Sequence, residues 1–173
     1  MTSKPPLRAG VSASTVQLPP GEWPSLFAFL CAHFDTIAAE EWRARFARGL
    51  VLDEAGQPLD ISAPYRPGLR VRYYRELAHE VAVPFEASVL YRDEHLLIAD
   101  KPHFLPVIPS GRHLQETLLV RLKHALDLTP LTPLHRIDRD TAGLVMFSVN
   151  PQTRAMYQSL FPQRAISKVY EAL

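Results

Sequence analysis

The chain has 173 residues, of which 47% are hydrophobic and 21% charged, as expected for a globular protein of one domain or two small ones. Nineteen basic and 18 acidic residues give a formal net charge of +1, which excludes a uniform blanket of positive charge. The single cysteine, Cys31, excludes an internal disulfide framework and a cysteine-based zinc site. The longest apolar run, Leu26–Ala32, is too short for a membrane span, and residues 1–10 lack a secretory signal, so we expect a cytoplasmic protein without a membrane partner.

The first elements along the chain are helical. Residues 1–20 are polar and contain several prolines, and we predict that they are disordered. Apolar residues then recur at helical spacing between Trp23 and Phe34. A second helix is predicted over 38–48, because its first turn is acidic, its last turn is basic and Gly49 follows as a stop.

A hairpin and a strand follow these helices. The sequence LVLDEAGQPLD, residues 50–60, predicts a short strand, a turn and a returning strand, and residues 69–74 alternate as a further strand. Residues 21–78 are therefore predicted to form a small domain of two helices and a hairpin. Residues 79–86 are predicted to be a linker.

The remaining residues, 86–173, predict a second domain. Its expected elements are two strands around a turn at 93–94, a helix at 115–126, a strand at 143–149, a helix at 151–161 and a strand at 165–172. The whole chain is thus predicted to be α+β, with a mixed, largely antiparallel sheet flanked by helices. Because a fold seldom ends at a strand, as it would here at Leu173, we expect the chain to be a fragment with an incomplete second domain.

The densest group of charged residues is LHRIDRDTAGLVMFSV, residues 134–149. It places six polar or charged side chains between a proline-framed loop and an apolar strand. Loops at the mouths of strands often carry functional residues, but charge clusters of this kind also occur as solvated turns with ion pairs. Composition and spacing leave both interpretations open.

The segment HRIDRDTAGL, residues 135–144, resembles the signature H-R-L-D-R-x-T-S-G-L of RluA-type pseudouridine synthases, with Ile137 and Ala142 as the two departures. Asp-Lys-Pro at 100–102 and SKVYEAL at 167–173 are similar to two further elements of that family and occur in the same order. The related RsuA-type enzymes usually have Gly-Arg-Leu-Asp at this point, so His135 favours the RluA type.

This resemblance implies an isomerase that breaks the glycosidic bond of a uridine in RNA, rotates the base and reattaches it through carbon. Asp138 would be the catalytic carboxylate, acting on the ribose either as nucleophile or as base, and Asp140 should be replaceable. Arg139 would help to displace the target base, and Tyr170 would pack on the uracil. The other implied substrate-binding residues are His135, Arg136, Thr141 and Lys168.

The predicted N-terminal domain resembles the alpha-L RNA-binding motif found ahead of many pseudouridine synthases. The shared detail is a basic helix end followed by a glycine and a hairpin. A solvated charged face explains the same pattern equally well. The predicted RNA contacts are Arg43, Arg45, Arg48, Arg70 and Arg72 in this domain, and Lys101 and Arg112 in the second one.

The resemblance implies an enzyme whose partner is ribosomal or transfer RNA, without an obligate protein partner, and the lack of ligand clusters and glycine-rich loops predicts that it needs neither a metal nor an organic cofactor. The alternative is a catalytically incomplete fragment that binds RNA weakly and does not turn it over. In the resembling family the chain continues beyond the K-x-Y-x-A element and supplies an arginine partner for the catalytic aspartate. The C-terminus therefore separates the two hypotheses.

Overall fold

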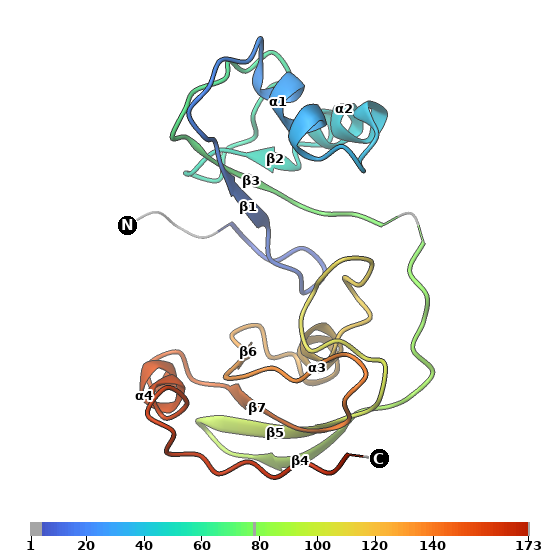
Figure 1. The fold of residues 1–173 in the computed structure, drawn as a ribbon, viewed down its shortest axis with the longest axis vertical. Helices are drawn as coiled ribbons and strands as arrows, with labels where there is room; N and C mark the ends of the chain where they lie inside the picture. Colours follow the sequence, from blue (N-terminus) through green and yellow to red (C-terminus); the bar gives the residue numbers. More distant parts are fainter. Residues whose placement is uncertain (1–4, 78, 173) are drawn as a thin grey trace. The chain divides into compact units, whose positions relative to one another are not determined.

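The computed structural model describes residues 5–77 and 79–172 and consists of two compact units (Figure 1). The N-terminal unit contains Ser12–Glu76 together with residues 5–8. The C-terminal unit contains Leu77–Leu173 and also Ala9–Val11. Each unit combines antiparallel strands with helices, so the predicted α+β class is confirmed. Positions 78 and 173 of the predicted domains lie outside the described residues.

The N-terminal unit packs two helices against a three-stranded antiparallel sheet of order β1-β3-β2. Its elements are β1 (Ser14–Gln17), α1 (Leu26–His33), α2 (Ala39–Ala47), β2 (Val51–Leu52) and β3 (Arg70–Tyr73). The Ser25 hydroxyl caps α1 by accepting a hydrogen bond from the Ala28 amide at 3.1 Å. Trp42 and Phe29 are the largest fully buried side chains of the core between helices and sheet.

Part of the segment predicted to be disordered is instead a strand. Residues Ser14–Gln17 pair antiparallel with Arg70–Tyr73, and Leu18 directly after them is buried. The reason is that Val16 and Leu18 complete the core of this unit, which repays the cost of ordering the segment. The predicted hairpin is only partly formed, because its return is reduced to one bridge, at Pro58, a residue without a backbone N–H.

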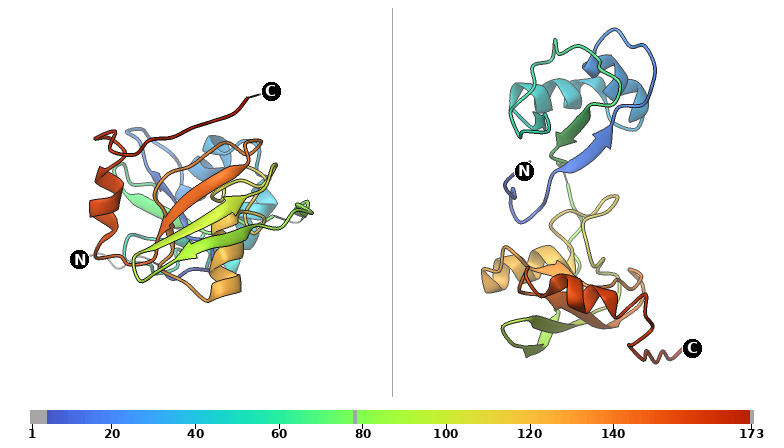
Figure 2. Two further views of the ribbon diagram at one scale, coloured as in Figure 1. Left: turned by 90° about the horizontal axis from the view of Figure 1, so that it is seen from below. Right: turned by 90° about the vertical axis from the view of Figure 1, so that its left-hand side faces the viewer.

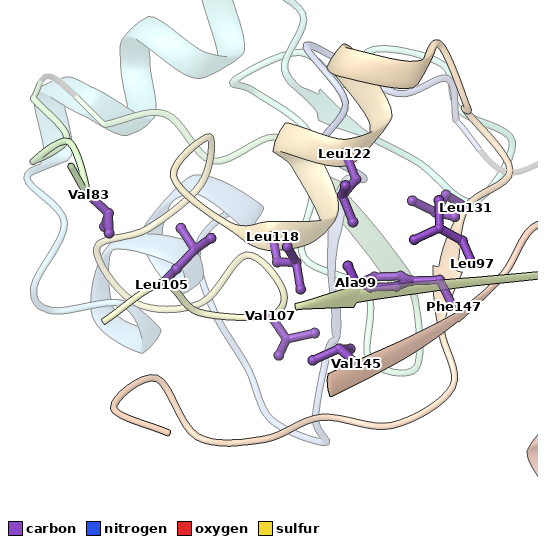
Figure 3. Close-up of a cluster of buried hydrophobic side chains, with 10 residues drawn as sticks. All are labelled: Val83, Leu97, Ala99, Leu105, Val107, Leu118, Leu122, Leu131, Val145 and Phe147. Atoms are coloured by element: carbon purple, nitrogen blue, oxygen red, sulfur yellow. The ribbon is translucent and has the colours of Figure 1, made fainter. Parts of the chain in front are cut away.

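The C-terminal unit has a four-stranded antiparallel sheet of order β4-β5-β7-β6. Its elements are β4 (Ser88–Arg92), β5 (Leu96–Lys101), α3 (Leu118–Leu126), β6 (Thr132–Pro133), β7 (Gly143–Ser148) and α4 (Arg154–Ser159). Figure 2 shows α3 lying across one face of this sheet. In the core of the unit, Leu118 and Leu122 of α3 meet apolar residues of β5 and β7 (Figure 3).

Two elements near the C-terminus differ from the prediction. Helix α4 begins at Arg154 rather than at Pro151 and ends at Ser159. Residues 165–172, predicted to be a strand, form no strand. In the described part of the chain no strand pairs with this segment, and residues 166–170 instead line a hollow together with Ile98 of β5 and Met146 of β7. No helix among the described residues is long and apolar enough to cross a bilayer.

Candidate functional site

The motif at 135–144 forms a loop that leads into β7. Its first part lies along β7, since the Leu134 amide donates to the Met146 carbonyl at 2.9 Å and the His135 Nε2 accepts from the Met146 amide at 3.1 Å. The Asp138 turn, residues 138–141, then closes with a hydrogen bond from the Thr141 amide to the Asp138 carbonyl. The chain enters the sheet at Gly143, whose φ of +126° favours glycine.

A buried lysine holds the backbone of the Asp138 turn in place. Lys101 at the end of β5 is fully buried, and its Nζ donates to the carbonyls of Pro102 at 2.9 Å, Leu105 at 2.8 Å and Arg139 at 3.0 Å. Burial lowers the pKa of Lys101, while the nearby carboxylates of Asp140 and Asp138 act in the opposite direction. The prediction that Lys101 contacts phosphate is therefore wrong, because its ammonium group is enclosed and already satisfied.

A second anchor holds the next residue of the turn. The His103 Nδ1 donates to the Asp140 carbonyl at 2.7 Å. The Asp140 side chain accepts from the Arg139 Nε at 2.9 Å, and both side chains are largely exposed. The turn is thus tied at two consecutive carbonyls, of Arg139 and Asp140, while the Asp138 side chain stays open to solvent.

Asp138 lies at the edge of a depression of about 630 Å³, which we call the Asp138 depression. Two arginines of the motif, Arg136 and Arg139, also line it. Ser110 and His113 line it from a loop that precedes α3. An exposed carboxylate beside guanidinium groups can approach a phosphate-bearing ligand and act on it as nucleophile or base.

The other motif residues meet in a separate hollow of about 340 Å³, the His135 pocket, which is lined by His135, Lys168 and Tyr170 among others. The ring of Phe161 lies 5.2 Å from the His135 ring, and the Lys168 Nζ lies 4.9 Å from the Phe161 centroid. Burial lowers the pKa of His135, and the Lys168 charge lowers it further, so the imidazole is neutral at neutral pH. Sequence reasoning missed Phe161, which no motif marks.

The structure therefore brings the predicted residues together in two groups rather than one. Asp138, Arg136 and Arg139 line the Asp138 depression, whereas His135, Lys168 and Tyr170 line the His135 pocket. Ile137 lines both hollows, so a single residue of the motif separates them. Thr141 contributes its backbone to the turn, and its amide closes it.

A family model described as RNA pseudouridylate synthase matches residues 95–173. Over these residues the chain is similar to RNA pseudouridine synthases, in agreement with the RluA-type motifs of the sequence. An uncharacterised RNA pseudouridine synthase of Synechocystis is 32% identical over 78% of this chain and 46% of its own length. The ribosomal large subunit pseudouridine synthase D of Pseudomonas aeruginosa is 33% identical over 54% of this chain and 30% of its own. The tRNA pseudouridine(31) synthase of Saccharomyces cerevisiae is 34% identical over 49% of this chain and 20% of its own.

The chain thus spans less than half the length of these pseudouridine synthases. The family match includes both hollows of the C-terminal unit and every predicted substrate-binding residue. It does not reach the N-terminal unit, for which the resemblance to an alpha-L motif remains a prediction.

Two of the predicted RNA contacts in the N-terminal unit are buried. Arg45 is 4% exposed, with its guanidinium 4.8 Å from the Trp42 ring and 3.5 Å from Glu41, and burial lowers its pKa. Arg72 in the central strand β3 is 9% exposed. Their prediction as phosphate contacts is wrong in this structure, because little of either side chain is accessible to a ligand.

The other predicted arginines of this unit are on the surface. Arg43, Arg48 and Arg70 have about half of their side-chain area exposed. Each forms an ion pair with a glutamate, at 2.8 Å with Glu40, 2.6 Å with Glu76 and 3.9 Å with Glu54, respectively. Exposed pairs of this kind are weak, so a phosphate can replace the glutamate as partner.

Proposed function

We propose that this chain carries the catalytic centre of an RNA pseudouridine synthase that acts on ribosomal or transfer RNA in the cytoplasm, with Asp138 as the catalytic carboxylate. The observation that carries the proposal is the Asp138 turn. Its backbone is fixed by Lys101 and His103, and its carboxylate stands free at the edge of a depression lined by arginines. A rigid backbone under an exposed reactive group is what positional catalysis needs.

In the proposed reaction the uridine leaves the RNA stack, which costs a few kcal/mol in a paired region and less in a loop. Arg136 and Arg139 would bind the phosphates on either side of the sugar, and the Asp138 carboxylate would reach the ribose. It would either bond to the ribose carbon as uracil leaves, or remove a ribose proton to give a glycal. Tyr170 would pack its ring on the uracil while the base turns.

The relatives support an RNA substrate without choosing between two classes. One is named for the large ribosomal subunit and another for transfer RNA. We propose that the exposed arginines of the N-terminal unit, Arg43, Arg48 and Arg70, bind RNA phosphates without reading sequence. Selection of the uridine would then depend on the C-terminal unit.

A gene deletion tests the proposal in the host cell. Pseudouridines are mapped in ribosomal and transfer RNA from cells without the gene and from cells complemented with wild type, Asp138→Asn or Asp140→Asn. We expect wild type and Asp140→Asn to restore the lost positions and Asp138→Asn to restore none. Restoration by Asp138→Asn would refute the assignment of the catalytic carboxylate.

A second candidate function is RNA binding without turnover. It is favoured by the placement of Asp138 and Tyr170 in different hollows and by the exposure of Tyr170, 63% of which is open to solvent. Incubation of the purified 173-residue chain with unmodified transfer and ribosomal RNA separates the two candidates. Binding that weakens steeply with salt, without any pseudouridine formed, supports the second candidate, and multiple turnovers exclude it.

A further inference from the structure

Residues 79–86, predicted to be a linker, are bound along the surface of the C-terminal unit, and we call them the strap. Val83 is buried in the core of the unit, and its amide donates to the Glu116 carboxylate at 2.7 Å. Arg121 of α3 donates to the carbonyls of Val83 at 2.6 Å and Phe85 at 2.8 Å. The strap is therefore part of this unit and not a free connection.

Glu80 forms the most concentrated contact of the strap. Its Oε1 accepts from the amides of Leu114 at 2.6 Å and Glu116 at 2.9 Å, and its Oε2 accepts from the amide of Gln115 at 2.9 Å. Three consecutive N–H groups thus converge on one carboxylate. Hydrogen bonds to an ionised acceptor are about twice as strong as neutral ones.

Residues 114–116, whose amides bind Glu80, directly follow the loop 110–113. This loop forms one wall of the Asp138 depression. Ser110 and His113 exchange two backbone hydrogen bonds of 2.9 Å and both line the depression. Arg112 lies between them and is exposed. Because Leu114 follows His113 directly, the position of this wall depends on where Glu80 holds the Leu114 amide.

We propose that Glu80 is a positioning residue, which fixes the loop 110–113 so that Arg112 binds an RNA phosphate beside the Asp138 depression. The inference rests on the proposed function and extends it to residues outside the family motifs. Arg112 carries the contact itself, and Glu80 acts only through the loop. In Glu80→Gln one acceptor oxygen becomes an NH2 donor and the negative charge is lost, so at least one of the three amides faces a donor, the other hydrogen bonds weaken, and the loop samples other positions.

The test measures the affinity of the whole chain for a fluorescein-labelled RNA hairpin with a uridine-containing loop, by anisotropy at low salt. Glu80→Gln is compared with Glu86→Gln, an exposed residue of the same strap that has no ion pair or hydrogen bond within the described residues. Both changes remove one negative charge and so have the same general effect on RNA attraction. We expect Glu80→Gln alone to weaken binding, by roughly tenfold.

A double-mutant cycle with Arg112→Ala shows whether Glu80 acts through the loop. We expect Glu80→Gln to weaken binding in the wild-type background and to have no further effect once Arg112 is alanine. Equal losses in both backgrounds would overturn the inference, because they would indicate a general loss of structure. Unchanged affinity in Glu80→Gln would overturn it as well.

Hydrogen exchange provides a readout that does not involve RNA. The amides of residues 114–116 should exchange roughly tenfold faster or more in Glu80→Gln, and unchanged exchange would contradict the hydrogen bonding on which the inference depends. The affinity cycle requires no turnover. If pseudouridine formation proves independent of Asp138, the proposed function fails. The affinity cycle can still be interpreted in that case.

Discussion

The Asp138 turn and the C-terminal segment, residues 165–172, carry two of the family motifs, and the structure supports them very differently. The turn is tied at two successive carbonyls by Lys101 and His103. In the C-terminal segment, Val169 is 90% exposed and Tyr170 is 63% exposed. This segment contacts the rest of the unit through the Lys168 ammonium group, which lies over the Phe161 ring.

The difference lies in where each region finds partners for its backbone. The turn precedes β7, so the core that orders β5 and β7 also orders Lys101 beneath it. The segment has the apolar alternation of a strand, but it pairs with none of the strands among the described residues, although β4 is an edge strand. Side-chain pattern alone does not make a strand.

The largest effect is expected from Lys101→Met, which tests how firmly the turn is held. The substitution keeps a side chain of similar length but removes the donor from three carbonyls, of which that of Leu105 is buried. We expect a loss of about 3 kcal/mol in the free energy of unfolding, measured by denaturant titration. Lys168→Met is the control, because the ammonium group of Lys168 is exposed. A loss of less than about 1 kcal/mol in the free energy of unfolding of Lys101→Met would show that the turn does not depend on Lys101.

Tyr170→Ala tests the opposite region. Since the ring is exposed, we expect the free energy of unfolding to change by less than about 0.5 kcal/mol. Affinity for the labelled RNA hairpin should fall by roughly tenfold, because stacking on an aromatic side chain contributes about 1–3 kcal/mol per base. Val169→Ala is the matched control on the adjacent, even more exposed residue. A clear loss of stability in Tyr170→Ala would mean that the ring is packed and not free to stack.

Much of the fold was predictable from the sequence because it depends on periodic apolar residues. Helix α3 lies within the predicted 115–126, and β7 within the predicted 143–149, since both present apolar residues at the spacing of their element. The two strands around the turn at 93–94 are confirmed for the same reason. The presence of Asp138 at a hollow was also indicated by its motif.

Partners that are distant in the chain were not predictable in this way. Lys101, Arg45 and Arg72 have surface residue types, and only the fold shows that they are buried. Glu80 belongs to a segment whose composition indicates a linker, yet three amides from residues 114–116 bind it. In each case the decisive contact joins residues that no local pattern connects.

Glu116 binds the strap, because its carboxylate accepts a hydrogen bond from the Val83 amide. Burial raises the pKa of Glu116, but the Val83 amide and the Arg121 guanidinium outweigh it, so the net shift is downward. Its contribution to stability is therefore fully present above its ordinary pKa of 4.5 and is lost as the pH falls through the lower folded value. We expect Glu116→Gln to cost about 1 kcal/mol at pH 7 by denaturant titration.

The pH dependence distinguishes a bound strap from a loose one. The difference between wild type and Glu116→Gln should shrink as the pH falls below about 4.5. Glu86→Gln should match the wild type at every pH, since its carboxylate is exposed. A constant difference between wild type and Glu116→Gln would show that the charge of Glu116 does not hold the strap.

The smallest expected effect is on the pKa of His135, which lies in the same motif as the Asp138 turn and close to the C-terminal segment. Burial lowers this pKa, and the positive charge of Lys168 lowers it further. Lys168→Met should therefore raise the pKa of His135 while leaving the contribution of burial in place, and NMR titration of the ring protons measures the change. Arg164→Met, an exposed cation that precedes the C-terminal segment, is the control and should leave this pKa where it is. An unchanged pKa of His135 in Lys168→Met would mean that Lys168 does not lie near the His135 pocket in solution. The contact of Lys168 with Phe161 would then be contradicted as well.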